Sequence, residues 1–103
     1  MNKDFVIGQS AKDNWKILSE AKQNYIWFHL DDYPSPYVIL HKTFTESLKS
    51  EIKEAAIACK ENSKYKNLPS ISVIYCEVKN LRKGSKVGQV IIKSNKKCKK
   101  LVI

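Results

Sequence analysis

The sequence predicts an α+β fold in which two helices pack on a mostly antiparallel sheet, in the order β-α-β-β-α-β-β-β. Strand-like and helix-like segments follow one another along the chain, and short loops join neighbouring strands, which favours antiparallel hairpins. The 103 residues include 43% hydrophobic side chains and ten aromatic rings, which is enough for one hydrophobic core. No linker divides the sequence, so we expect residues 1–103 to form a single domain.

The N-terminal segment predicts a short strand followed by a helix. Residues 4–8 (DFVIG) form the strand, which ends at a glycine. Residues 10–24 form the helix, because Ser10 is a suitable N-cap and Asp13 follows at nearly the capping-box spacing. The apolar face that we expect this helix to bury, spaced i, i+4, i+7, consists of Ala11, Trp15 and Leu18.

Residues 25–30 (YIWFHL) and 37–41 (YVILH) predict a hairpin around the turn DDYPSP. Aromatic and β-branched residues favour strands, and the two prolines of the turn lack the N–H that a central strand needs. Alternation assigns the aliphatic side chains to the face under the helices: Ile26, Phe28, Leu30, Val38 and Leu40. The opposite face carries Trp27, His29, Asp31, Tyr37, Ile39 and His41.

This second face has two interpretations. Flat rings on a sheet can stack unpaired nucleic-acid bases, and the candidates for base stacking are Trp27, His29 and Tyr37. The alternative is ordinary packing, in which the helix of residues 10–24 covers the rings. The sequence leaves both interpretations open.

Residues 43–62 form the clearest helix of the sequence. Thr43 and Glu46 match the capping box. The apolar stripe, spaced i, i+4, i+7, i+8, i+11, consists of Leu48, Ile52, Ala55, Ala56 and Cys59. Lysine and glutamate alternate on the other face, which we expect to be solvated.

The remaining chain predicts three more strands. The first, residues 71–79, alternates between a face with Ile71, Val73 and Tyr75 and a face with Ile74, Cys76 and Val78. The last two strands are residues 89–93 and 99–103, and residues 63–70 and 80–88 form loops.

The net charge comes entirely from the C-terminal quarter. It is +9, from 19 Lys and Arg against 10 Asp and Glu. Residues 1–78 hold ten basic and all ten acidic residues, whereas residues 79–103 hold nine basic residues and no acid. A general lysine bias would not remove every acid from one end, so this segregation favours a surface that binds a polyanion.

The sequence predicts no metal, no cofactor and no membrane span. Cys59, Cys76 and Cys98 are widely separated, and the two histidines do not complete a zinc-binding spacing. We expect reduced thiols. No apolar run approaches the roughly 20 residues that span a bilayer, and the first ten residues lack the apolar region of a secretory signal. We therefore expect a cytoplasmic protein, with the nucleus as the alternative.

Three segments together resemble the signature blocks of the NFACT-R domain, the RNA-binding-type module of ribosome quality control factors. They are GQSAKDNWKI, YIWFHLDDYPSPYVIL and IYCEVKNLRKGSKVGQVII, and they cover nearly the whole chain in order. The sequence is nearer to the stand-alone form that opens a eukaryotic coiled-coil domain-containing protein. The matching positions are Gly8, Ala11, Asp13, Asn14, Ile26, Trp27, Phe28, His29, Lys79, Asn80, Arg82, Lys83, Gly84, Gly88 and Gln89.

The sequence departs from the family pattern at two places. The family usually has Gly-Ser-His after the turn proline, where this chain has Ser35-Pro36-Tyr37. The proline that usually follows Arg-Lys is missing before Gly84. The tRNA-engaging N-terminal module of the large factors also has no counterpart in these residues, so we do not expect this chain alone to tail nascent chains.

The resemblance implies an α+β fold and association with RNA, on the large ribosomal subunit or with tRNA. A glycine-containing basic loop lets the backbone approach a partner, and arginine and lysine suit phosphate oxygens. The phosphate-binding candidates in this loop and in the basic C-terminal strands are Lys79, Asn80, Arg82, Lys83, Lys86, Lys93, Lys96 and Lys97.

Other functions compete with RNA binding. An adaptor that docks an acidic protein, or a DNA-binding sensor-type domain, would use the same positive charge. An enzyme would need His29 with Asp31 or Asp32 as an acid–base pair, or His29 with Cys76 as a thiol pair. The sequence has no P-loop, GxSxG or HExxH motif, so we expect no catalysis. The sequence does not indicate an oligomeric state.

Overall fold

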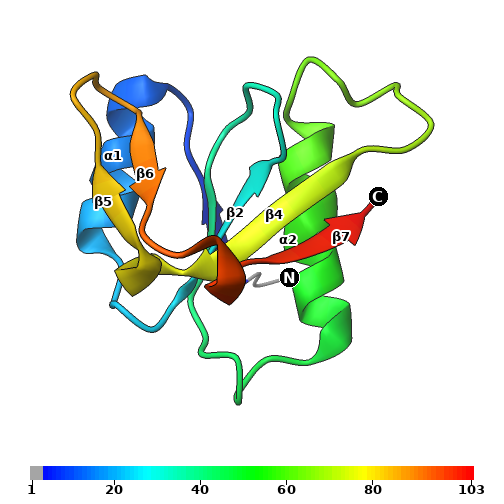
Figure 1. Ribbon diagram of the computed structural model, residues 1–103. Helices are drawn as coiled ribbons and strands as arrows, with labels where there is room; N and C mark the ends of the chain where they lie inside the picture. Colours follow the sequence, from blue (N-terminus) through cyan, green and yellow to red (C-terminus); the bar gives the residue numbers. More distant parts are fainter. Residues whose placement is uncertain (1–3) are drawn as a thin grey trace.

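The computed structural model describes residues 4–103 and confirms the predicted α+β class (Figure 1). The elements are β1 (Phe5–Ile7), α1 (Ala11–Glu20), β2 (Ile26–Leu30), β3 (Val38–Leu40), α2 (Lys49–Glu61), β4 (Ser72–Glu77), β5 (Leu81–Lys83), β6 (Val90–Ile92) and β7 (Lys99–Val102). Two 3₁₀ turns, η1 (Val78–Asn80) and η2 (Asn95–Lys97), follow β4 and β6. The predicted elements occur in the predicted order, and β5 is an additional short strand inside the predicted loop of residues 80–88.

The main sheet is antiparallel throughout, with the strand order β1-β3-β2-β4-β7. Its centre is β2, where Trp27 lies opposite Ile39 of β3 and Cys76 of β4. β5 and β6 form a separate two-stranded sheet, the β5–β6 hairpin. Both faces of the central strands are buried, so both need a covering layer.

The two helices lie on opposite faces of the main sheet. α2 covers the aliphatic face, where Ala55, Ala56 and Cys59 pack on side chains of β2, β3 and β4. α1 and the β5–β6 hairpin together cover the other face, which holds Trp27 and Tyr37 (Figure 1). The expectation that both helices share one face is wrong, because the second face is apolar and also needs cover. The alternative, that α1 covers the rings, is correct.

The N-cap of α1 is as expected, but its buried face is not. The Ser10 hydroxyl accepts a hydrogen bond from the backbone N–H of Asp13. The helix ends at Glu20, four residues before the predicted end, and Ala11 is exposed. Its buried side chains are Asn14, Ile17 and Leu18.

α2 begins later than predicted. Thr43 and Glu46 do exchange capping-box hydrogen bonds, but these hold a turn that precedes the helix. The helix starts at Lys49, and the Glu51 carboxylate accepts from the backbone N–H of Leu48. Leu48 is therefore 65% exposed rather than part of the buried stripe. None of the described helices is long and apolar enough to cross a membrane.

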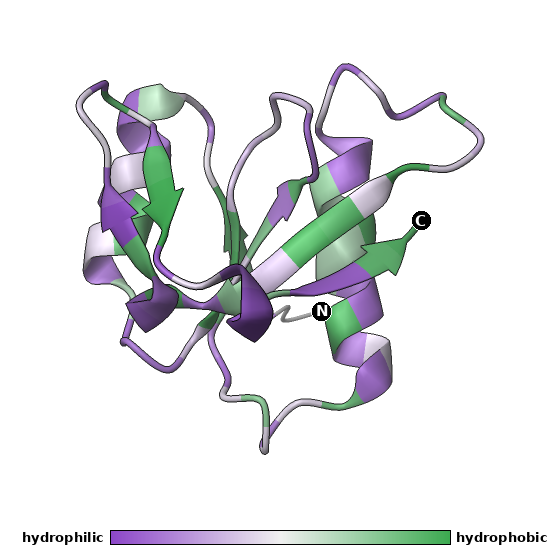
Figure 2. Cartoon of the chain, in the orientation of Figure 1, coloured by the Kyte–Doolittle hydropathy of each residue, from purple (hydrophilic) through white to green (hydrophobic). Residues whose placement is uncertain are grey.

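The strand alternation predicted for β4 is confirmed, since Val73 faces α2 whereas Ile74 and Cys76 face the α1 side. Hydropathy separates the two strands of the hairpin (Figure 2). β6 is mostly apolar, whereas β5 carries one buried residue, Leu81, followed by two exposed cations. The hairpin thus has an apolar underside and a charged outer surface.

Candidate nucleic-acid interface

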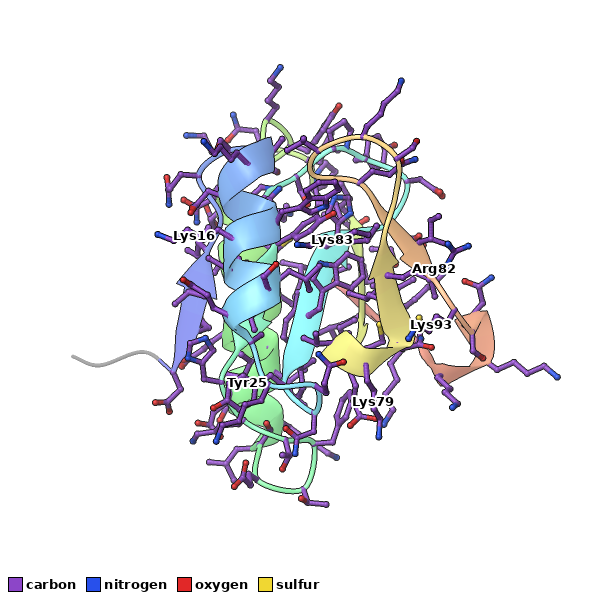
Figure 3. All side chains as sticks on the ribbon, turned by 90° about the vertical axis from the view of Figure 1, so that its left-hand side faces the viewer. Lys16, Tyr25, Lys79, Arg82, Lys83 and Lys93 are labelled. Atoms are coloured by element: carbon purple, nitrogen blue, oxygen red, sulfur yellow. The ribbon has the colours of Figure 1, made fainter. Side chains whose placement is uncertain are left out.

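The segment from η1 to η2 forms a basic surface beside α1. Its cations are all exposed: Lys79, Arg82, Lys83, Lys86, Lys93, Lys96 and Lys97. Figure 3 shows this side of the molecule, with Lys79, Arg82, Lys83 and Lys93 on or beside the hairpin and Lys16 on α1. Residues 79–103 contain no acid, so no carboxylate of this segment neutralises the surface. We call this surface, completed by Lys12 and Lys16 of α1, the basic face.

The hairpin places its two central cations on opposite sides. Arg82 pairs with the exposed Ile91, and Lys83 pairs with Val90. Because side chains alternate along a strand, Lys83 shares the side of the buried Leu81 and reaches toward α1. Arg82 points away from the core. The two residues therefore offer positive charge on both sides of the hairpin.

Lys83 connects the hairpin to α1. Its ammonium donates a hydrogen bond to the Ser19 hydroxyl and lies 5.2 Å from the centroid of the Trp15 ring. The indole N–H of Trp15 donates to the carbonyl of Gln89 at 2.9 Å. Trp15 is half-buried and was missed as a site residue, because it looked like part of the core stripe of its helix. Only the packing of the hairpin shows that part of this side chain stays at the surface.

The structure brings Lys79 and Lys93 together. The Lys93 ammonium donates to the backbone carbonyl of Lys79 at 3.0 Å, so the Lys93 side chain lies against the backbone of η1. Lys79 also forms a 3.7 Å ion pair with Glu77, with both side chains partly exposed, so this pair adds little to stability. Within residues 4–103, no ion pair involves Arg82 or Lys83.

Asn80 has a structural position rather than a surface one. It is 6% exposed, its amide group donates to the Ser94 carbonyl at 2.9 Å, and its amide oxygen accepts from the Ser94 N–H at 3.1 Å. The side chain thus ties η1 to the end of the hairpin. Little of the side chain is open to a phosphate, so these contacts indicate a structural role for Asn80.

The remaining C-terminal cations lie elsewhere. Lys100 forms a 2.8 Å ion pair with Asp31, and the Lys99 ammonium lies 5.0 Å from the Phe44 ring centroid. Both belong to β7 at the edge of the main sheet, away from the hairpin. The positive charge that the sequence gathers at one end is therefore divided by the fold.

The three candidates for base stacking form one aromatic cluster. Trp27 and His29 are stacked with ring centroids 5.7 Å apart, and the Tyr37 ring meets both edge-on. Trp27 is 2% exposed and Tyr37 is 3% exposed, beneath the hairpin. Neither ring offers a face to a base in this structure. His29 is half-buried and lines a cavity of about 380 Å³ with Asp31 and the other two rings.

The titratable groups of this cluster are held in their neutral forms. Burial lowers the pKa of His29, and its hydrogen bond to the Leu30 carbonyl and the charge of Asp31 oppose this only in part. Burial also raises the pKa of Cys76 to about 12. A thiol with such a pKa is not a thiolate near neutral pH and is a poor nucleophile. The proposed pairing of His29 with Cys76 as a thiol nucleophile thus finds no support.

The first sequence block has a structural role. Asn14 is buried, and its side-chain oxygen accepts from the N–H of Tyr37 at 3.1 Å. A Cβ at Gly8 would lie 1.8 Å from that oxygen, so only glycine fits there. The Asp13 carboxylate accepts from the N–H of Gln9 and completes the cap of α1. The block thus fixes α1 on the sheet and so orients Trp15.

Comparison with known proteins places this geometry in a family. Residues 2–94 match the family described as NFACT protein RNA binding domain. The chain is 30% identical over 106 aligned residues to Protein JLP2 of Saccharomyces cerevisiae, covering 93% of this chain and 51% of that protein. The chain thus spans about half the length of this relative.

A solved structure has the same fold. The C-terminal part of the fibronectin/fibrinogen-binding protein of Streptococcus suis (FBPS) is 26% identical and superposes with a TM-score of 0.83. The match covers 96% of this chain and 39% of that one. Nearly all of the described fold therefore lies within a shared module.

Proposed function

The chain belongs to the NFACT protein RNA binding domain family, and from this premise we propose that it binds RNA through the basic face. The observation that carries the proposal is the position of Arg82 and Lys83. They lie on a hairpin without acids, and within residues 4–103 they have no carboxylate partner. A charge that is already paired would have to break its ion pair to reach a phosphate, whereas these two are available.

The chemistry of the basic face suits a sugar–phosphate backbone. Exposed lysines and arginines replace the counterions of RNA phosphates, and counterion release supplies most of the affinity of non-specific binding. The hairpin holds Arg82 and Lys83 on a hydrogen-bonded pair of strands. Lys79 and Lys93 add further exposed cations next to the hairpin.

A place on the ribosome agrees with this mode of binding. We propose that the ligand is a structured RNA of the large ribosomal subunit or tRNA, met in the cytoplasm. In this proposal the residues of the basic face hold the RNA and do not react with it, and the buried Cys76 thiol, whose pKa is raised to about 12, is a poor nucleophile.

Fluorescence anisotropy with labelled single-stranded RNA, an RNA hairpin and duplex DNA, measured over a salt series, tests the proposal. We expect RNA affinity to fall steeply with salt, with a log–log slope of several units, as phosphate contacts require. Equal affinity for duplex DNA would indicate general capture of polyanions. No binding to any of the three near physiological salt would reject the proposal and favour an acidic protein partner.

A further inference from the structure

We propose that the groove around Trp15 is a binding site for one unpaired nucleotide, whose base stacks on the indole while its phosphate is held by the surrounding lysines. This inference rests on the proposed RNA binding and adds a subsite to it. It also assigns base stacking to Trp15 of α1 instead of Trp27, His29 and Tyr37.

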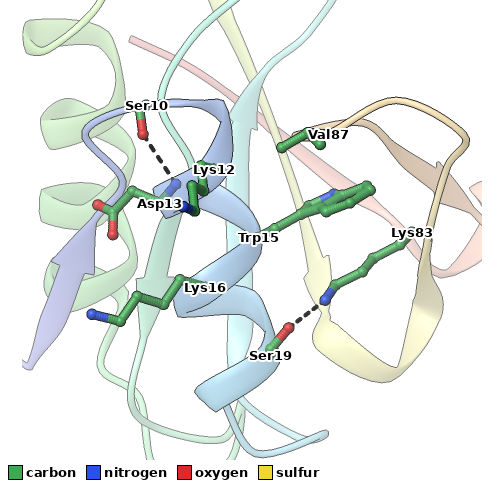
Figure 4. Close-up of a pocket in the computed structure, with 8 residues that line it drawn as sticks. All are labelled: Ser10, Lys12, Asp13, Trp15, Lys16, Ser19, Lys83 and Val87. Atoms are coloured by element: carbon green, nitrogen blue, oxygen red, sulfur yellow. Dashed lines mark hydrogen bonds between the residues drawn. The ribbon is translucent and has the colours of Figure 1, made fainter.

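The groove has the size and the lining that a base needs. Its volume is about 590 Å³, and its lining is mainly apolar. Figure 4 shows the Trp15 ring between Val87 of the hairpin loop and the side chain of Lys83. Val87 is 57% exposed and leaves an apolar surface open beside the ring. Ser10, the N-cap of α1, and Ser19 within the helix also line the groove.

The indole is fixed before any ligand arrives. Its N–H donates to the carbonyl of Gln89 at 2.9 Å, across 74 residues of sequence. That carbonyl belongs to the hairpin, and Gly88 next to it has a φ of +88° and packs against Ala11 of α1. A stacking platform loses little conformational entropy on binding when its ring cannot rotate. The ring is therefore preorganised by the contact between hairpin and helix.

Three lysines surround the groove, on both of its sides. Lys12 and Lys16 come from α1, and Lys83 comes from β5. The Lys83 ammonium lies over the Trp15 ring, 5.2 Å from its centroid, so a base that stacks on this face must displace it. The Lys83 side chain is exposed and can then reach the phosphate of that nucleotide. Asp13 is the single acid of the lining, and the N–H of Gln9 already occupies its carboxylate. An apolar surface surrounded by lysines suits a nucleotide, which has a flat base and a charged phosphate, better than it suits an uncharged ligand.

The burial of the two tryptophans makes the inference testable by fluorescence. Trp27 is 2% exposed in the core, whereas Trp15 is half-buried at the groove. Base stacking quenches indole emission, so quenching of the wild-type protein by RNA would report on Trp15 without any substitution. We expect single-stranded RNA to quench this emission and a blunt RNA duplex, whose bases are already stacked, to leave it nearly unchanged.

Substitutions at Trp15 separate the ring face from the hydrogen bond. W15L keeps an apolar side chain without a π face, and W15F keeps a ring without the N–H donor. We expect W15L to weaken binding of single-stranded RNA about 5- to 150-fold, the range for losing one stacked base, and W15F to retain most of the affinity. Binding of the blunt duplex should not change. Y33L removes another exposed aromatic ring, outside the groove, and serves as the matched control.

The possible outcomes distinguish this inference from the function on which it rests. If the wild-type protein binds no RNA, the proposed function fails and the subsite fails with it. If it binds RNA with a steep salt slope but W15L, shown to be folded by circular dichroism, binds equally well and no quenching occurs, only the subsite is rejected. A deoxy strand of the same sequence identifies the source of the nucleotide, since an equal loss in W15L extends the site to DNA.

Discussion

Removing two charges from the hairpin should change the salt dependence of RNA binding by a predictable amount. The variant is R82A/K83A. Within residues 4–103 neither side chain has an ion-pair partner, so alanine leaves no unpaired carboxylate behind. Lys83 loses its contact with the Trp15 ring, which at an exposed site contributes about 0.5–1 kcal/mol. The variant should therefore remain folded.

The magnitude follows from counterion release. Each phosphate contact to single-stranded RNA contributes about 0.7 to the slope of log affinity against log salt, so losing two contacts should lower the slope by about 1.4. Counterion release contributes nothing at about 1 M salt, where the two proteins should bind alike. At about 0.1 M salt the affinity should then be lower by a factor of about 10^1.4, or roughly 25-fold.

The assay is fluorescence anisotropy with labelled single-stranded RNA between about 0.05 and 0.5 M salt, a range where counterion release dominates. K49A/K53A is the matched control, because it removes the same two charges from the exposed surface of α2, on the opposite side of the sheet. We expect its slope to stay within a few tenths of the wild-type slope. If R82A/K83A keeps the wild-type slope, or if the control loses as much, the basic face is not the site and only net charge matters.

Three further predictions concern the parts that position the basic face. N80A should lower the free energy of unfolding by about 1–3 kcal/mol, because it leaves both backbone groups of Ser94 without their side-chain partner; urea unfolding measures this, and an unchanged midpoint would contradict the structural role. G88A should lower the free energy of unfolding by about 1–2 kcal/mol, because alanine disfavours the left-handed backbone conformation of this residue. Its Cβ would also lie 2.7 Å from the Cβ of Ala11, so we expect a lower melting temperature and weaker packing of the hairpin on α1. Burial lowers the pKa of His29 from 6.5, so as the pH falls below 6.5 the unfolded state binds a proton first and the free energy of unfolding decreases, by at most about 1.4 kcal/mol per pH unit. Urea unfolding at pH 7.5 and 5.5 should show this loss in the wild type and a smaller one in H29N. Equal losses in the two proteins would contradict the lowered pKa of His29.

The local features of the fold could be predicted from the sequence because they depend on neighbours within a turn or along a strand. Alternation places Phe28 and Val73 on one face of the sheet and Cys76 on the other, as the structure has them. The Ser10 cap needs only an N–H three residues away. The separation of charge toward the C-terminus is a property of the sequence itself.

Contacts between distant segments could not be predicted in this way. No local pattern tells that α1 and the hairpin share the second face of the sheet, or that Trp27 and Tyr37 are covered by them. β5 looked like a loop because its last two residues are charged, and it becomes a strand only by pairing with β6.

The sequence by itself determined the fold class, the alternation of the strands and the sign of the charge. The tertiary structure decided which cations stand together and which ring they surround. Lys83 meets Ser19 across 64 residues and Trp15 meets Gln89 across 74. Such contacts form only when the apolar underside of the hairpin is buried against α1 and the sheet, since hydrophobic burial depends on which surfaces fit together and not on the residues next in the chain.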